Sequence, residues 1–488
     1  MQFGDLLMAQ GLIDADGLVR AAERQAVRGG GLADSLVALG LVEAARMEAV
    51  REQVPAGPRT VADTGLTLTT LLRLLLKSML VDGFETPTDL VGRLKLPYGV
   101  VTELLRICTE RQLVEALGAG GLRATELRYG LSVQGRQWAQ EALDQNLYVG
   151  PAPVPHERFC VQILRQRIAR ERIDRAQLED AFGNLVVPDG LIRKLGPAIN
   201  AMRAMLLYGP PGNGKTTIAE KIGKIFNDIV FIPHAVEVGG QIMKLYDPSL
   251  HVAIRPGNGT AEPAAAAPRL REGDVDQRWV PCRRPVVVVG GELTLEMLDL
   301  QFNSLSRFYE APLHVKALNG TFIIDDFGRQ LVRPQDLLNR WIVPLESRVD
   351  YLKLHTGNSF QIPFDAFVIF STNLTPQDLV DPAFLRRIPY KLEIENPSAE
   401  DYRAVFALVA RGAGLELADD AFRAVLAALS DKQVPLAYYQ PKFITDQVLA
   451  ACKFEGSVPA YRPDLIAEAL DNLYMRAKTG SGGTAARM

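Results

Sequence analysis

A glycine-rich segment near the middle of the chain places the strongest constraint on the fold. The nine residues Gly209-Pro-Pro-Gly-Asn-Gly-Lys215-Thr216-Thr217 separate an apolar run at 204–208 from a segment at 218–226 with helical periodicity. An apolar strand, such a loop and a helix in this order are the context in which backbone N–H groups wrap a phosphate chain. The glycines permit the required turn, and the helix adds the positive end of its dipole.

The segment therefore predicts a nucleotide site of the P-loop type. We expect Lys215 to reach the β- and γ-phosphates of ATP and the hydroxyl of Thr216 to bind Mg²⁺. The other candidate nucleotide-binding residues are the rest of the loop, namely Gly209, Pro210, Pro211, Gly212, Asn213, Gly214 and Thr217.

A second apolar run, at 320–324, ends in the paired carboxylates Asp325 and Asp326. This pattern is typical of a Walker B strand, in which Asp325 is the metal ligand. Asp326 stands where a Glu usually positions the attacking water. Because its side chain is one methylene shorter, we expect slow hydrolysis or a shifted water. A strand ending in a solvated acidic turn is the alternative.

Polar residues further along complete the predicted site. The apolar run 366–370 leads into Asn373, which is expected to orient water or contact the γ-phosphate, although an Asn that starts a turn is the alternative. Arg387, with Arg386 as second choice, is the candidate arginine finger that faces the ATP of a neighbouring subunit. A structural Arg–carboxylate pair is the alternative for either arginine.

These motifs resemble those of AAA+ ATPases over roughly residues 161–473. The resemblance implies an α/β core with a parallel sheet at 156–395 and an α-helical lid at 396–477. It also implies a sensor 2 role for Lys442, with a plain surface lysine as the alternative, and an adenine pocket lined by 185–187. A predicted hairpin at 352–363 looks like the pre-sensor 1 hairpin of MoxR-like members. We further predict a helix over 295–309.

The first 55 residues contain an internal repeat. Two copies lie 29 residues apart (Leu7 to Leu36), with Phe3, Leu7 and Gly11 in the first and Leu32, Leu36 and Gly40 in the second. A repeat this short cannot bury its apolar face alone, so we expect the copies to pack on each other.

This pattern resembles the N-terminal domain of type II secretion and type IV pilus assembly ATPases, some of which bind cyclic di-GMP. The sequence departs from that pattern at Gln2 and Gly31, where the family has Arg, and at Ala33, where it has Gly. A small helical interaction module is the alternative.

Residues 66–147 predict a winged helix domain. Helices are expected near 67–81, 86–94, 99–110 and 132–143, with two strands at 113–117 and 127–131. The third helix carries one Arg against two Glu, and the wing offers only Arg123 and Arg128. Since phosphate contacts need clustered Lys and Arg, we favour protein interaction over DNA binding.

Pro- and Gly-rich segments at 54–65 and 148–155 are predicted linkers. The segment at 255–273 is a predicted mobile loop, and the tail 478–488 is predicted to be disordered.

Composition excludes several classes of protein. The chain has 488 residues, 48% of them hydrophobic and 23% charged, with a net charge of −3, which indicates globular domains with no general attraction to nucleic acid. Its four cysteines lack metal-ligand or redox spacing. The longest apolar stretch, 66–81, contains Arg73 and Lys77, and Asp5 interrupts the opening segment. We therefore expect a cytoplasmic protein without membrane insertion.

Together these features predict a multidomain AAA+ ATPase that forms a homo-oligomeric ring, expected to be a hexamer. It would hydrolyse Mg·ATP between subunits and remodel or regulate a protein partner. One alternative is an ATP-gated switch with slow turnover that responds to a signal such as cyclic di-GMP. The other is a DNA-binding regulator.

Overall fold

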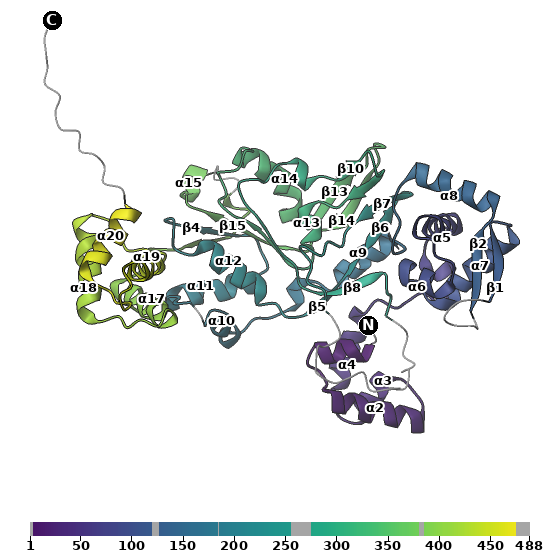
Figure 1. The fold of residues 1–488 in the computed structure, drawn as a ribbon, viewed down its shortest axis with the longest axis horizontal. Coiled ribbons are helices and arrows are strands. Elements are labelled where there is room, and N and C mark those ends of the chain that lie inside the picture. The colour runs from purple at the N-terminus through teal and green to yellow at the C-terminus, as the bar shows by residue number, and fades with distance from the viewer. Residues whose placement is uncertain (1–2, 120–125, 184, 255–274, 380–384, 475–488) are drawn as a thin grey trace, which may run out of the picture.

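The computed structural model describes residues 3–119, 126–183, 185–254, 275–379 and 385–474. Figure 1 shows an elongated molecule, with the helices of 399–473 at one end, residues 68–145 at the other, and an α/β core between them. The helices of residues 3–53 lie beside the core. The predicted mobile loop at 255–273 and the predicted tail at 478–488 fall outside the described residues.

Five parallel strands form the central sheet of the core. Their order is β16 (Tyr390–Glu393), β4 (Met205–Tyr208), β15 (Phe367–Thr372), β12 (Thr321–Ile324) and β9 (Val286–Val289). β4, β12 and β15 are apolar over most of their length, as expected for parallel strands that are covered on both faces. The carboxyl ends of all five strands meet at one edge of the sheet.

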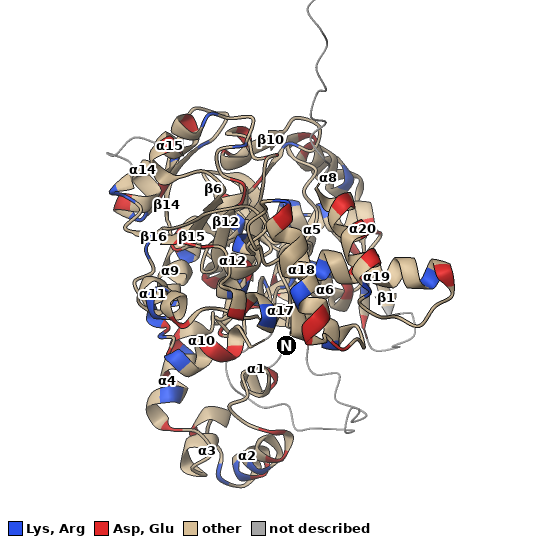
Figure 2. Ribbon diagram, turned by 90° about the vertical axis from the view of Figure 1, so that its left-hand side faces the viewer, with Lys and Arg blue, Asp and Glu red and all other residues tan. Residues whose placement is uncertain are grey.

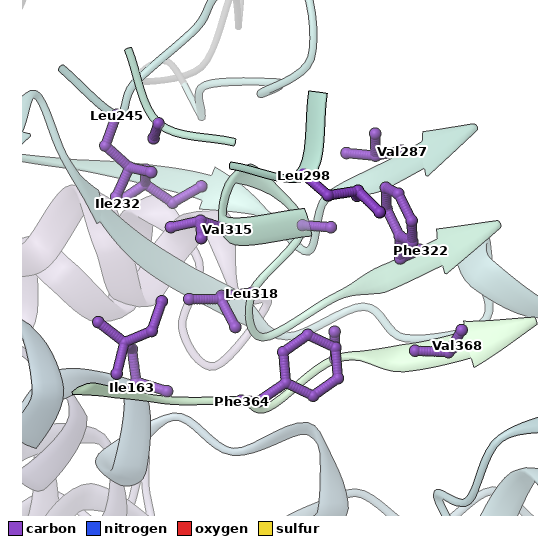
Figure 3. Packing of buried hydrophobic residues seen from close by; sticks show 14 of the residues in the cluster. Ile163, Ile232, Leu245, Val287, Leu298, Val315, Leu318, Phe322, Phe364 and Val368 are labelled. Atoms are coloured by element: carbon purple, nitrogen blue, oxygen red, sulfur yellow. The ribbon is translucent and has the colours of Figure 1, made fainter. Parts of the chain in front are cut away.

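Successive residues of these strands point to opposite faces, and each face has its own helices. Met205, Ile323 and Ile369 share a buried cluster with α11 (Asp189–Asn200) and α12 (Lys215–Lys224). Leu206, Phe322 and Phe370 belong instead to a larger cluster with α14 (Pro334–Ser347). Figure 3 shows part of this larger cluster, including Phe322, Val287 and Leu298.

Further elements surround the central sheet. A second sheet has the order β10 (Gln301–Asn303), β11 (Phe308–Glu310), β7 (Gln241–Lys244), β6 (Ala235–Val238) and β3 (Val154–Pro155). Two antiparallel pairs are β5 (Ile229–Pro233) with β8 (Trp279–Arg283), and β13 (Val349–Lys353) with β14 (Ser359–Pro363). Short helices are α9 (His156–Arg165), η2 (Ile168–Arg170), α10 (Arg175–Ala181), η3 (Glu296–Leu298), α13 (Leu313–Lys316) and α15 (Pro376–Leu379).

The predicted helix over 295–309 is wrong, because this stretch forms η3, β10 and β11. The side-chain oxygen of Asn303 accepts hydrogen bonds from the N–H groups of Leu305 (3.0 Å) and Ser306 (2.9 Å). Such a local turn competes with helical hydrogen bonding. β11 then pairs with β7, so tertiary contacts decide the conformation.

Four helices occupy the N-terminal repeat region. They are α1 (Phe3–Ala9), α2 (Ala15–Arg28), α3 (Leu32–Ala38) and α4 (Ala44–Gln53). Leu7 and Ala21 of the first copy share one buried cluster with Leu32, Leu36 and Met47 of the second. The two copies therefore form a common core, while the resemblance to secretion and pilus ATPases stays a prediction.

Residues 62–145 contain three helices, a strand pair and a further helix. After η1 (Ala62–Thr64) these are α5 (Leu68–Asp82), α6 (Pro87–Leu94), α7 (Tyr98–Glu110), β1 (Val114–Ala119), β2 (Leu127–Leu131) and α8 (Val133–Gln145). The bounds lie within a few residues of those expected from the sequence. Assignment to the winged helix class remains a prediction.

Four helices at the C-terminal end of the described chain have a hydrophobic cluster of their own. They are α17 (Ala399–Gly412), α18 (Asp419–Asp431), α19 (Gln440–Glu455) and α20 (Pro463–Leu473). Tyr402, Phe406, Val425 and Val448 are among the residues of their buried cluster, which is distinct from those of the core. We call residues 399–473 the lid.

The predicted linkers are held by a buried ion pair. Arg278 and Asp276 are 0% and 2% exposed, and Arg278 Nη2 lies 2.8 Å from Asp276 Oδ2. Arg278 Nη1 also donates to the carbonyl oxygens of Thr64 (3.0 Å) and Pro153 (3.2 Å), one near the end of each linker. The N–H of Asp276 donates to Pro55 O at 2.9 Å. These segments are therefore fixed against the core.

Charged residues of both signs are interspersed over the helices (Figure 2). Among the described residues, no helix is long and apolar enough to cross a membrane.

Lys77 of α5 provides a test of the packing of residues 62–145. Its side chain is 2% exposed, its Nζ donates to Asn146 O and Oδ1, and burial lowers its pKa to about 8, with the charge of Arg73 contributing. Between pH 8 and 10.5 the unfolded chain keeps the proton that the folded chain releases. The free energy of unfolding should therefore rise with pH across that window, by at most about 3 kcal/mol. The same amount is lost again as the pH falls toward 8.

Lys77→Met should remove this dependence, which can be measured as the urea midpoint of wild type and variant at pH 7.5 and 9.5. Exposed Lys453→Met should follow wild type at both values. An unchanged pH dependence in Lys77→Met would show that Lys77 is not the buried base.

Candidate nucleotide site

The P-loop runs between β4 and α12, as the sequence predicts. Gly209, Gly212 and Gly214 have φ values of 138°, 79° and 77°, which side chains with a Cβ rarely adopt. Two of them are also crowded. A Cβ on Gly209 would lie 2.3 Å from Ile394 O, and one on Gly212 would lie 2.2 Å from Cδ1 of Tyr439. The loop glycines are therefore required by local backbone geometry.

Lys215 and Thr216, at the start of α12, interact with the carboxylates that follow β12. Lys215 is 6% exposed, and its Nζ donates to Gly209 O (2.9 Å) and Pro210 O (2.8 Å). Burial lowers the pKa of Lys215, while the negative charges of Asp325 and Asp326 oppose this shift. Thr216 Oγ1 donates to Asp325 Oδ2 at 2.7 Å.

Asp325 and Asp326 follow β12 directly, and Asn373 follows β15, the next strand of the sheet. Asn373 Nδ2 donates to Asp326 Oδ1 at 3.2 Å. Asp326 has a φ of 47°, a left-handed conformation that is uncommon outside glycine. The carboxyl edge of the sheet thus brings these predicted residues together with the P-loop.

The turn after Asp326 contains residues to which the sequence analysis assigned no role. Gln330 Nε2 donates to Asp325 O (3.0 Å), and its Oε1 accepts from the N–H of Gly328 (2.8 Å). The positive charge of Arg329 contributes to the lowered pKa of Lys215. The polar side chains of Arg329 and Gln330, three and four residues after Asp326, are the signal that could have pointed to them.

The two arginine-finger candidates lie in different surroundings. Arg387 Nε is 2.6 Å from Glu346 Oε1 of α14, and the Arg387 side chain is only 19% exposed. Arg386 is exposed. Within one chain Arg387 therefore has a carboxylate partner, and its role as an arginine finger stays a prediction.

A pocket of about 1000 Å³ lies between the P-loop and the lid. Residues 185–187 line it, and so do 212–214 of the P-loop. Contact of 185–187 with an adenine ring stays a prediction. Lys442 is on the lid side and forms an exposed ion pair with Asp446 at 3.1 Å. The pocket adjoins the P-loop glycines, so a molecule bound by its phosphates can place its remaining part there.

The donor set fits a Mg²⁺-nucleotide. A hydroxyl and a carboxylate already meet at Thr216 and Asp325, and oxygen ligands of this kind suit Mg²⁺. Phosphates would be held by Lys215 and by the loop N–H groups before α12. Pro210, Pro211 and Thr217 lie in the same loop and first helical turn. The carbonyl oxygen of Pro210 accepts the hydrogen bond from Lys215, and Thr217 lines the pocket.

Comparison with known proteins gives matches to parts of the chain. A family model described as "Domain of unknown function (DUF8689)" matches residues 398–472, the lid region. A vesicle-fusing ATPase of Dictyostelium discoideum is 51% identical over 47 residues, which are 10% of this chain and 6% of that relative. The chain thus matches only a small fraction of the relative's length.

Two solved structures overlap with more of the chain at low identity. NtrX from Brucella abortus has a TM-score of 0.38 at 15% identity, over 62% of this chain and 60% of NtrX. Domain III of the Thermotoga maritima replication initiation protein DnaA has a TM-score of 0.33 at 13% identity, over 60% of this chain and 96% of that domain. Both TM-scores are low, so neither likeness establishes a shared fold.

The parallel sheet and the P-loop joined to Asp325 together support a P-loop nucleotide site in an α/β core.

Gly212→Ala tests the contact between the P-loop and Tyr439. Strain at φ 79° and the clash with the ring should lower the free energy of unfolding by about 2–4 kcal/mol, measured by urea denaturation. Gly190→Ala is the matched control, because Gly190 lines the same pocket and its Cβ would meet nothing within 4 Å. Equal stability of the two variants would contradict the contact.

Proposed function

We propose that this chain is an AAA+ ATPase that binds and hydrolyses Mg·ATP. The observation that carries the proposal is the hydrogen bond between Thr216, which follows the P-loop lysine, and Asp325, which follows β12. It joins the phosphate-binding loop to a metal-binding carboxylate across two separate motifs. Bound Mg²⁺ would neutralise charge on the β- and γ-phosphates.

The chain's own residues divide the remaining tasks. Lys215 binds the phosphates, Asp326 holds the attacking water and accepts its proton, and Asn373 orients that carboxylate through its amide. Catalysis of this kind depends mainly on positioning and electrostatic stabilisation.

We further propose a homo-oligomeric ring, expected to be a hexamer, in which Arg387 completes the site of a neighbour. Release of Arg387 from Glu346 would accompany this contact. The N-terminal helices and residues 66–147 would dock a protein partner that the ring remodels or regulates.

The structure favours protein docking over DNA binding by residues 66–147. Arg106 of α7 forms ion pairs with Glu103 and Glu110, and Arg128 of β2 pairs with Glu85. These guanidinium groups are engaged by carboxylates, which would compete with phosphate contacts.

A slow ATP-gated switch is the second candidate. It is favoured by Asp326, whose short side chain and left-handed backbone limit its reach toward water. The comparisons give no support to cyclic di-GMP as the signal.

ATP turnover by purified protein tests the enzyme proposal. Lys215→Ala should lower turnover by more than about 100-fold, and Asp326→Asn should do so while retaining ATP binding. Lys453→Ala, on an exposed lid surface, should match wild type. Strong ATP binding with wild-type turnover below about one per minute would support the switch instead.

Mixing inactive subunits tests catalysis between subunits. Equimolar Lys215→Ala and Arg387→Ala proteins should regain about a quarter of wild-type turnover, since one supplies Arg387 to the intact P-loop of the other. A mixture of Lys215→Ala with Asp325→Asn is the control. Lys215 and Asp325 belong to the same nucleotide site, so every subunit in this mixture has a defective site. The mixture should therefore regain far less turnover. Full activity of Arg387→Ala alone would exclude the arginine from catalysis.

A further inference from the structure

Asn213 differs from its neighbours in the P-loop because its side chain is bonded to the lid and its connection. It is 2% exposed. Its Nδ2 donates to Asn396 Oδ1 at 2.8 Å, and its Oδ1 accepts from the N–H of Tyr438 at 3.3 Å. Asn396 lies in the connection that enters α17, and Tyr438 lies just before α19.

A second contact adjoins the first. Gly212 O accepts from the N–H of Tyr439 at 3.1 Å, and the Tyr439 ring lies against the Cα of Gly212. The Tyr439 hydroxyl in turn meets the hydroxyl of Tyr474, at the end of α20, at 2.9 Å. Two consecutive P-loop residues therefore contact the connection that enters the lid and the turn before α19.

The same residues line the pocket between P-loop and lid. Asn213 and Asn396 form part of its wall, and Tyr438 and Tyr439 continue that wall on the lid. Since both ends of the Asn213 amide are used by these contacts, its side chain acts on a bound nucleotide through the lid.

We propose that Asn213 is a positioning residue that fixes the lid over the nucleotide pocket, so that nucleotide and lid stabilise each other. The inference rests on the proposed nucleotide-binding function. Truncation of Asn396 leaves the buried amide of Asn213 without its acceptor, and truncation of Asn213 removes both contacts and frees the pocket wall. The nucleotide should then leave faster, while the phosphate-binding and catalytic groups stay in place.

The coupling must be reciprocal. If the bridge holds the lid against bound nucleotide, then nucleotide must protect the lid from opening by the same free energy. The amides at the start of α19 should exchange hydrogen more slowly when ADP is bound, and this protection should shrink when Asn213 is truncated.

The test measures dissociation of a fluorescent ADP analogue from full-length protein. Asn213→Ala and Asn396→Ala should each accelerate dissociation by about five- to tenfold, and the double variant should be no faster than either single one. Asn396→Asp keeps the acceptor for Asn213 Nδ2 and should stay near wild type. Asn472→Ala, on exposed α20, is the matched control.

A purely structural role for Asn213 would lower stability without the non-additive change in dissociation rate. The rate of single-turnover hydrolysis is measured on the same variants to separate the two roles. This rate at saturating ATP should change less than about twofold in Asn396→Ala, which breaks the same bridge from the lid connection. Wild-type dissociation rates in both alanine variants, or additive effects in the double variant, would overturn the inference. Complete loss of binding, as expected for Lys215→Ala, would instead place Asn213 in the phosphate cradle.

Failure of the proposed function gives a different result. If wild-type protein binds no nucleotide, the lid contact is still measurable in the free protein, where Asn213→Ala should increase hydrogen exchange at the start of α19. Unchanged exchange there would remove the basis of the inference.

Discussion

The parallel pairing of β4, β15 and β12 is the constraint on which the candidate site depends. Parallel strands end at the same edge, so the segments that follow them must meet there. Three different strands are followed by Thr216, Asp325 and Asn373. Thr216 donates a hydrogen bond to Asp325, and Asn373 donates one to the adjacent Asp326. A one-residue slip of β12 would turn Phe322 and Ile323 to the wrong faces, so the buried core that fixes the register also fixes the site.

The buried Arg278–Asp276 pair plays a similar part for the domains around the core. Burial of two charges is costly unless every donor has a partner. Here Asp276 takes Nε and Nη2, and the carbonyls of Thr64 and Pro153 take Nη1. Satisfying this guanidinium requires both inter-domain segments to lie against the core. The position of the N-terminal regions is thus coupled to a core hydrogen-bond network.

Local signals explain which features could be predicted from the sequence. The P-loop and the carboxylates after β12 sit beside apolar strands, and their chemistry is visible within a few residues. The segment 295–309 was predicted incorrectly because its conformation depends on pairing with β7, distant in sequence. Contacts of Asn213 with Asn396 and Tyr438 span 183 and 225 residues, so no local pattern encodes them.

Electrostatics connects the site of one chain to the proposed assembly. Lys215 interacts electrostatically with Asp325, Asp326 and Arg329, and the charges of these four groups cancel. A triphosphate adds several negative charges, which Mg²⁺ offsets only in part, and a further cation would stabilise charge that develops in the transition state. In the proposed ring, Arg387 of a neighbouring subunit would provide that charge after its ion pair with Glu346 breaks. Because a half-exposed carboxylate competes weakly with a nucleotide in a dry interface, assembly of a ring would favour this transfer and thereby couple hydrolysis to oligomer formation.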